Sequence, residues 1–236
     1  MSDPTRDLIL VLADSKRLLG MRYAEWILGA PALEAGIACA SMAQDEWGHG
    51  RLLYALLKEF GDDVEKLEHG REPGEYRNIE LLDSAPESWP DLVIINALVD
   101  TALSVQLDAL RATEHAPLRQ RVGKILDEEE FHAAHGAAWL KRIATASSET
   151  KKLVSDAVAR ALPVILRWFG PSGDDLRRAF LARVEPLLAT AGISASGAAP
   201  DFQGFDASTR RTHNRGPDAA TVARIRGDKN RAFLMD

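Results

Sequence analysis

This sequence of 236 residues has a single cysteine and shows no recognisable targeting signal. Cys39 is the only cysteine, so no disulfide can form within the chain, a usage that fits a reducing compartment. Met1 is followed by polar residues rather than by the apolar core of a secretory signal. No uninterrupted apolar run reaches the roughly 18 residues that a membrane span needs. We therefore expect a cytoplasmic protein that does not enter a membrane.

The chain also lacks a surplus of positive charge. Its 29 lysines and arginines are outnumbered by 35 aspartates and glutamates, which gives a net charge of −6. Nucleic-acid-binding domains usually carry a basic surface. Nucleic acid is therefore not an expected partner.

Strand-length alternation of Val, Ile and Thr is missing, whereas Ala, Leu, Glu and Arg dominate, so we predict an all-α fold. The expected helices span residues 5–28, 32–60, 90–114, 118–145, 149–168 and 174–192. Glycines and prolines punctuate residues 61–88, which we interpret as a long crossover between two helical hairpins. That connectivity is typical of a ferritin-like four-helix bundle. We expect this bundle, with additional C-terminal helices, over residues 1–192, and an extended or partly ordered tail over 193–236 with a short helix near 218–226.

Two Glu-x-x-His motifs stand in equivalent places, Glu46 with His49 and Glu129 with His132, each in the second helix of its hairpin. Residues three apart share one face of a helix, so each pair can bind one metal ion. Paired motifs of this kind, with a carboxylate from each neighbouring helix, mark the di-iron and di-manganese bundle proteins. The pattern therefore predicts a metal site inside the bundle.

Asp100 is the candidate for a further carboxylate. It precedes Glu129 by 29 residues, and the turn expected near residue 115 lies halfway between them. Positions equidistant from the turn of an antiparallel hairpin lie at the same height, so Asp100 should meet Glu129 and His132. Glu128, Glu130 and Asp45 are interpreted either as solvated groups or as groups that support the ligands. Carboxylates often orient ligating histidines, which makes Asp45 the one to test. The predicted metal ligands are Glu46, His49, Asp100, Glu129 and His132.

The same offset, counted back from Glu46, leads to Arg17 instead of a carboxylate. A guanidinium is always charged, so at this fourth position of the site, here called its fourth corner, it would repel a cation. Two outcomes remain open: one metal position is altered or weakened, or Arg17 replaces metal charge by pairing with Glu46 or Glu129. Asp14, one turn away, either reaches in as a substitute ligand or pairs with Arg17. Glu25 lies too close to the turn to be a ligand.

These motifs resemble the phenylacetyl-CoA epoxidase family of bacterial phenylacetate breakdown, and within it the catalytic di-iron subunit most of all. The resemblance runs from about residue 15 to the end, loosely in the tail. Near the position of the family's first-helix glutamate this chain has Arg17, and its Tyr23-Ala24-Glu25-Trp26 stretch is closer to the sister structural subunit. The matching stretches are Met42–Gly50, Leu98–Asp100, Glu128–His132, Ala161–Ser172, Leu176–Phe180 with its following helix, and Asn230-Arg231.

The resemblance implies a ferritin-like oxidoreductase, a monooxygenase or epoxidase that uses O2 on an aromatic or acyl-CoA substrate in phenylacetate catabolism. Two iron ions are the implied cofactor, with one ion or manganese as the alternatives. The implied partners are an external reductase and a ferritin-like partner subunit, or further copies of the chain. Glu46, Glu129 and Arg17 are the candidate catalytic residues. A non-catalytic structural subunit or metal-free paralogue is the alternative function, and another ferritin-like metalloenzyme is a third.

Overall fold

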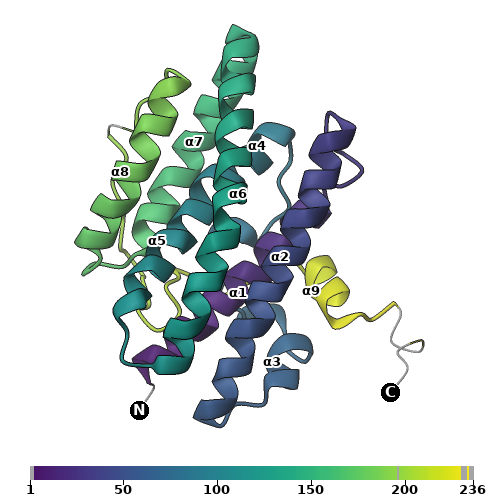
Figure 1. Ribbon diagram of the computed structural model, residues 1–236, viewed down its shortest axis with the longest axis vertical. Coiled ribbons are helices and arrows are strands. Elements are labelled where there is room, and N and C mark those ends of the chain that lie inside the picture. Colours follow the sequence, from purple (N-terminus) through teal and green to yellow (C-terminus); the bar gives the residue numbers. More distant parts are fainter. Residues whose placement is uncertain (1–2, 196, 230–232, 234–236) are drawn as a thin grey trace.

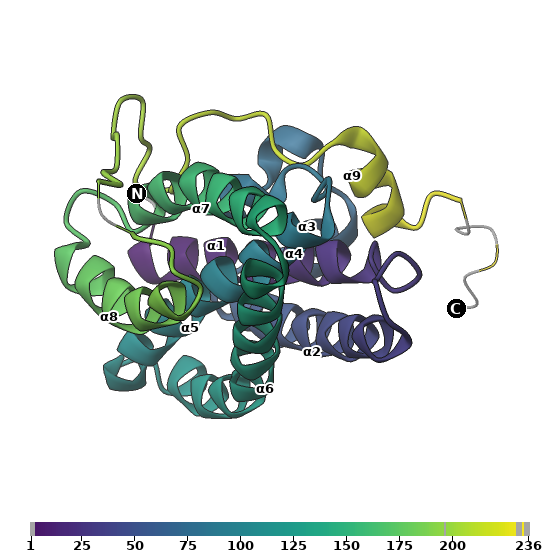
Figure 2. The ribbon, with the colours of Figure 1, turned by 90° about the horizontal axis from the view of Figure 1, so that it is seen from above.

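A four-helix bundle forms the centre of the computed structural model, which describes residues 3–195, 197–229 and 233. Its helices are α1 (Pro4–Ala24), α2 (Leu33–Leu57), α6 (Ala116–Ala146) and one continuous helix made of α4 (Trp89–Ile94), the π-helical segment η4 (Ile95–Asp100) and α5 (Thr101–Ala109). Figures 1 and 2 show α2 and α6 as long neighbouring helices with α1 and α5 beside them. Among the described residues the only β-pairing is an isolated bridge between Asp206 and Arg211. The predicted all-α, ferritin-like fold is confirmed.

Local sequence explains where the bundle helices begin. The Asp3 carboxylate accepts hydrogen bonds from the backbone N–H of Thr5 and Arg6 at the start of α1, and Ser88 caps α4 ahead of Pro90. Such caps satisfy N–H groups that have no partner within the helix. The predicted helix 5–28 ends early, at Ala24, because the chain tightens into i→i−3 hydrogen bonds before the Gly29–Pro31 break.

The crossover between the hairpins contains only short helices, as its glycines and prolines predicted. These are η1 (Lys58–Phe60), α3 (Val64–His69), η2 (Pro73–Glu75) and η3 (Glu80–Leu82). Asp14 of α1 fastens this segment to the bundle. Its buried carboxylate accepts hydrogen bonds from the Arg71 guanidinium at 2.9 Å, from the Arg77 backbone N–H at 2.8 Å and from the Tyr54 hydroxyl. Asp14 is thus neither a substitute ligand nor a partner of Arg17, which corrects both expectations.

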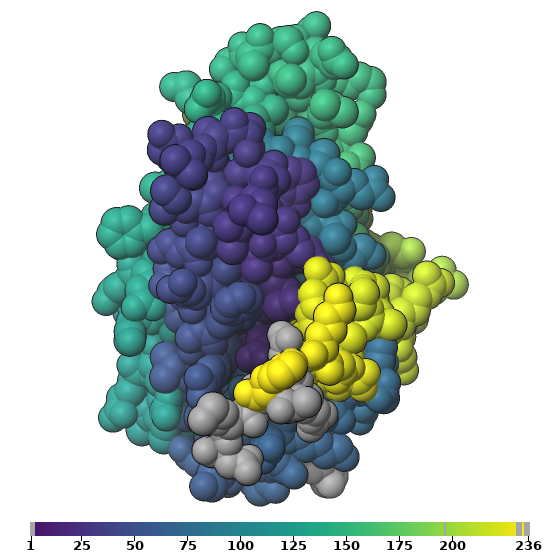
Figure 3. Space-filling view, turned by 90° about the vertical axis from the view of Figure 1, so that its right-hand side faces the viewer, coloured from purple at the N-terminus to yellow at the C-terminus, as the bar shows by residue number. Residues whose placement is uncertain are grey.

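The C-terminal part lies outside the bundle. After η5 (Leu110–Ala112) and α6, helices α7 (Ser148–Trp168) and α8 (Asp174–Thr190) cover one side (Figures 1 and 2). The chain beyond them runs over the crossover, where Arg211 pairs with Asp83 and donates to the Asn78 carbonyl at 2.6 Å. The short helix expected near 218–226 is α9 (Ala219–Arg226), and Figure 3 shows this C-terminal segment lying across the crossover and α1.

Among the described residues, one helix of the bundle is long and apolar enough to cross a membrane by length and composition, although charged residues interrupt it. This is the stretch Trp89–Ala112, and 78% of its most apolar window is buried inside the fold. Leu98, Leu103 and Leu107 are fully shielded from solvent. Burying each such side chain contributes roughly 1.5–3 kcal/mol. Its apolar character is therefore accounted for by the bundle core.

Candidate metal centre

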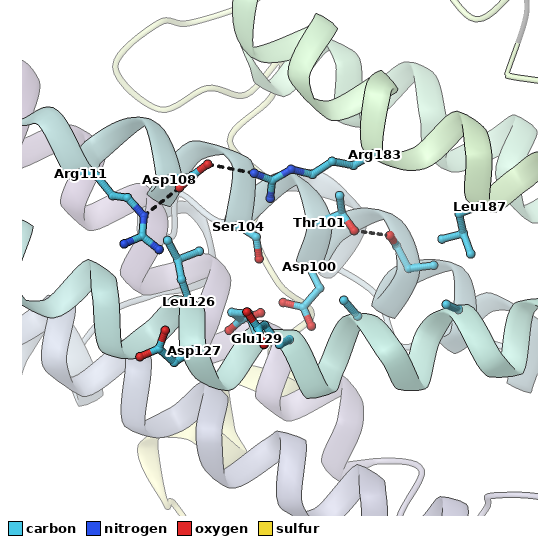
Figure 4. Close-up of a pocket in the computed structure, with 14 residues that line it drawn as sticks. Asp100, Thr101, Ser104, Asp108, Arg111, Leu126, Asp127, Glu129, Arg183 and Leu187 are labelled. Atoms are coloured by element: carbon cyan, nitrogen blue, oxygen red, sulfur yellow. Dashed lines mark hydrogen bonds and ion pairs between the residues drawn. The ribbon is translucent and has the colours of Figure 1, made fainter.

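The bundle brings the five predicted ligands together at its centre. Glu46 and His49 come from α2, Asp100 from η4, and Glu129 and His132 from α6. None of the five is more than 4% exposed. Figure 4 shows the Asp100 and Glu129 carboxylates close together, projecting from two facing helices. Buried carboxylates need charged or hydrogen-bonding partners, so the groups around them decide what this centre can hold.

Lys16 of α1 supplies the fourth corner of the centre. Its side chain is completely buried, and its Nζ lies 3.0 Å from Glu46 Oε1, 3.1 Å from Asp100 Oδ1 and 2.7 Å from Glu129 Oε1. An ammonium group has three N–H donors. All three are accounted for by carboxylates from three different elements.

Arg17 does not enter this cluster, which corrects its expected position. Its guanidinium faces the crossover, 3.7 Å from Glu68 of α3. One residue along a helix rotates a side chain by about 100°. In the second hairpin 29 residues separate Asp100 from Glu129, whereas in the first 30 residues separate Lys16 from Glu46. The sequence thus predicted a positive charge at this corner but assigned it to the neighbouring residue.

The two histidines are held in a reciprocal arrangement. His132 of α6 directs Nδ1 toward the cluster, 3.2 Å from Asp100 Oδ2, and Nε2 toward Asp45 of α2 at 3.3 Å. His49 of α2 has Nδ1 3.1 Å from Glu129 Oε1 and Nε2 2.6 Å from Glu128 of α6. A carboxylate on the outer nitrogen fixes the ring orientation and makes the inner nitrogen a better ligand. Asp45 and Glu128 therefore lie beside the histidines, in the supporting role that was one of the two left open for them.

Asp100 is supported from within the core. Its Oδ2 accepts a hydrogen bond of 2.9 Å from the Tyr23 hydroxyl, and Asn96 donates to the same hydroxyl at 2.9 Å. Asn96 lies in η4, which Gly136 allows to approach α6 closely, since a Cβ there would come within 2.7 Å of Asn96 Oδ1. π-Helical turns often mark functional sites. No motif in the sequence indicated that this turn, Tyr23 or Asn96 belongs to the centre.

Protonated side chains offset the negative charge of the buried carboxylates in this centre. Burial opposes the charge on Lys16, but Asp100, Glu129 and Glu46 hold its pKa well above the ordinary value. Burial and the neighbouring Asp100 and Glu46 raise the pKa of Glu129 well above that of a free glutamate. Burial also opposes protonation of His132, yet hydrogen bonds to Asp100 and Glu46 raise its pKa to about 11. Without metal, protons on these groups offset the buried negative charge.

The donor set is compatible with metal binding. Glu46, Asp100, Glu129 and His132 each offer a ligand atom, and these atoms lie within 4.8 Å of one another. Glu46 Oε2, Glu129 Oε2 and His49 Nδ1 are buried and have no hydrogen-bond partner among the described residues. Most buried polar atoms do have one, so unpartnered atoms of ligating type indicate a place for a cation.

Comparison with known proteins identifies the family. The sequence matches the family described as phenylacetic acid catabolic protein over residues 2–213. This chain belongs to that family. It is 31% identical over 150 residues to one subunit of the 1,2-phenylacetyl-CoA epoxidase of Escherichia coli (strain K12), covering 64% of this chain and 48% of the relative. To a second subunit of the same epoxidase it is 23% identical over 151 residues, covering 63% of this chain and 61% of that relative.

The phenylacetic acid catabolic family is thus the one that the motifs predicted. The chain spans only 48% of the length of the more similar epoxidase subunit and 61% of the other. The matched residues 2–213 include all five predicted ligands and Lys16.

In this member of the family a cavity of about 420 Å³ leads to the metal centre. It lies between α5, α6 and α8, and Asp100 and Glu129 form part of its wall (Figure 4). Arg111 and Arg183 lie at its other side and both pair with Asp108, at 2.8 and 2.9 Å. Ligand sites are typically cavities of roughly 300–1,000 Å³ with a few polar groups. The sequence did not single out these two arginines, since their proximity depends on how α8 packs.

Proposed function

We propose that this chain is an oxygenase-type enzyme of phenylacetate catabolism that uses O2 to oxidise an aromatic acyl-CoA or a related aromatic substrate. The observation that carries the proposal is the buried Glu46, Asp100, Glu129 and His132 cluster, in a chain that belongs to the phenylacetic acid catabolic family. The two epoxidase subunits it resembles support the reaction class.

Iron is the metal we propose for the centre. Glu46, Asp100, Glu129 and His132 would hold it, with His49 beside them as a further candidate. A bound ferrous ion would supply the electrons and the coordination position that O2 activation needs. The protein's own contribution is to orient the ligands and to exclude water. Tyr23 and Asn96 fix Asp100 for this purpose, and Asp45 fixes His132.

The 420 Å³ cavity is the proposed substrate site. Leu126, Ala133 and Leu187 form an apolar part of its wall that suits an aromatic ring near Asp100 and Glu129. Arg111 and Arg183 lie at its opposite side and suit the phosphates of an acyl-CoA. One guanidinium can donate two parallel hydrogen bonds to two oxygens of the same phosphate.

We further propose that the enzyme works in the cytoplasm with partners. No flavin, nicotinamide or iron–sulfur motif was found in the sequence, so an external reductase would deliver electrons. The similarity to two different epoxidase subunits suggests a ferritin-like partner subunit or further copies of the chain.

Turnover under ¹⁸O2 tests the proposed function. The metal-loaded full chain, with partner subunit, reductase and phenylacetyl-CoA, should give a product with one ¹⁸O atom by mass spectrometry. Glu129→Gln should abolish the label, whereas Glu149→Gln, at an exposed position of α7, should retain it. If the chain binds metal and the partner subunit but gives no labelled product, the proposed enzymatic function is refuted and a role as a structural subunit is favoured.

A further inference from the structure

The Lys16 ammonium occupies a position inside the metal centre where a cation would otherwise stand. It contacts Glu46, Asp100 and Glu129 through one oxygen each, at 2.7–3.1 Å, and is fully shielded from solvent. A metal ion at the same point would compete for the same three oxygens. Lys16 is therefore built into the centre rather than placed at its edge.

Formal charge explains what this substitution does. A complete di-metal centre of this type has four carboxylates, whose four negative charges two divalent ions neutralise. Here three carboxylates and one ammonium leave two negative charges, which a single divalent ion neutralises. Two divalent ions beside Lys16 would leave two surplus positive charges in a buried site, an arrangement that burial strongly penalises.

Four groups of the cluster can each still offer a ligand atom to this one ion, and these atoms lie within 4.8 Å of one another. His132 Nδ1 is 3.2 Å from Glu46 Oε1 and 3.2 Å from Asp100 Oδ2, and the second oxygens of Glu46 and Glu129 have no hydrogen-bond partner among the described residues. His49 Nδ1 lies 3.1 Å from Glu129 Oε1, an oxygen that Lys16 also contacts. His49 is not one of the four groups whose ligand atoms cluster in this way.

We propose that this chain binds one divalent metal ion, through Glu46, Asp100, Glu129 and His132, and that the Lys16 ammonium replaces the second ion of a di-metal centre. The inference rests on the proposed function only in taking the buried cluster as the metal site. His49 then stands outside the ligand set of this ion. The centre would hold one metal ion and the Lys16 ammonium where a di-metal centre holds two ions.

Metal stoichiometry tests the proposal without relying on turnover. Metal-free full-length chain is titrated with Mn²⁺, desalted and measured for metal per chain, and its electron paramagnetic resonance spectrum is recorded. The expected result is one Mn²⁺ per chain with an uncoupled, mononuclear signal. Two ions per chain with a coupled signal would overturn the proposal, and so would a chain that retains no Mn²⁺.

Two variants at position 16 extend the test. Lys16→Glu should raise the stoichiometry to two ions per chain and produce a coupled signal, whereas Lys141→Glu, at an exposed site of α6, should leave it at one. Lys16→Met, purified with metal present, covers the case in which Lys16→Glu does not fold. It should bind Mn²⁺ at least about tenfold more tightly than the unaltered chain, because a nearby positive charge has been removed. Weaker binding in Lys16→Met would contradict the proposal.

The two proposals can fail separately. One ion per chain without labelled product would support the one-ion centre and refute the oxygenase function. Two ions per chain with labelled product would refute the one-ion centre and support the oxygenase function.

Discussion

Removing the Lys16 ammonium should destabilise the metal-free protein, and the structure sets the size of the effect. Lys16→Met keeps the length of the side chain but leaves Glu46, Asp100 and Glu129 in a buried site without their shared cation. At an effective dielectric constant of about 20, one contact near 3 Å contributes about 5 kcal/mol before desolvation. Desolvation of the ammonium offsets much of this. Breaking a buried ion pair by removing one partner destabilises proteins by about 3–5 kcal/mol, and we expect a loss in that range.

Urea unfolding of metal-free protein, followed by circular dichroism, measures this loss. For a chain of this length each kcal/mol lowers the melting temperature by about 2–4 °C, so Lys16→Met should melt roughly 6–20 °C lower. Lys141→Met, on the exposed face of α6, is the matched control and should change the free energy of unfolding by less than about 0.5 kcal/mol. Adding Mn²⁺ should restore much of the lost stability, since a ligand that binds only the folded state stabilises it. If Lys16→Met stays within about 1 kcal/mol of the unaltered protein, the ammonium is not inside the cluster.

Three further predictions concern the surroundings of the centre. Asp45→Asn should lower metal affinity by roughly 10–100-fold, whereas Glu34→Gln on the same helix should not, as measured by competition with a chelator. Asp14→Asn should lower the free energy of unfolding in urea by about 3–5 kcal/mol, because the Arg71 guanidinium stays buried without its charge partner. The number of bound metal ions should not change. A lower number would mean that Asp14 acts as a ligand. Burial raises the pKa of Cys39 to about 11, so the thiolate forms less readily in the folded than in the unfolded chain, and any contribution of this group to stability is lost as pH rises toward 11. Iodoacetamide should therefore label Cys39 slowly at pH 8 and fast in urea, and equal rates would contradict its burial.

The general plan of the fold could be predicted because it depends on patterns within single helices. Helix-forming composition, the break at Gly29–Pro31 and the glycine- and proline-rich crossover all act locally. The pairing of Asp100 with Glu129 and His132 followed from counting residues on both sides of one turn. These predictions are confirmed because an antiparallel hairpin converts sequence separation into height along the bundle.

The fourth corner could not be predicted to the residue. The loops of the two hairpins differ, so the offset of one hairpin misses the other by one position, and one position rotates a side chain by about 100°. The position of Asp14 depends on Arg71 and Arg77, which arrive from the crossover. Contacts across 57 and 63 residues are not encoded in any helical period. The sequence therefore indicated the charge pattern of the centre better than the identity of its cation.

The centre depends on α1 less for its framework than for its charge. The ligand orientations are set between α2, η4 and α6: Asp45 positions His132, Glu128 positions His49, and Asn96 links η4 to the His132 carbonyl at 3.2 Å. Apart from the Tyr23 hydroxyl, α1 contributes only Lys16 to the cluster. A change at position 16 should therefore alter how many ions bind while leaving the other ligands in place. The proposed one-ion centre therefore predicts that a single side chain on α1 sets the number of bound metal ions, provided that the other three elements keep their hydrogen bonds.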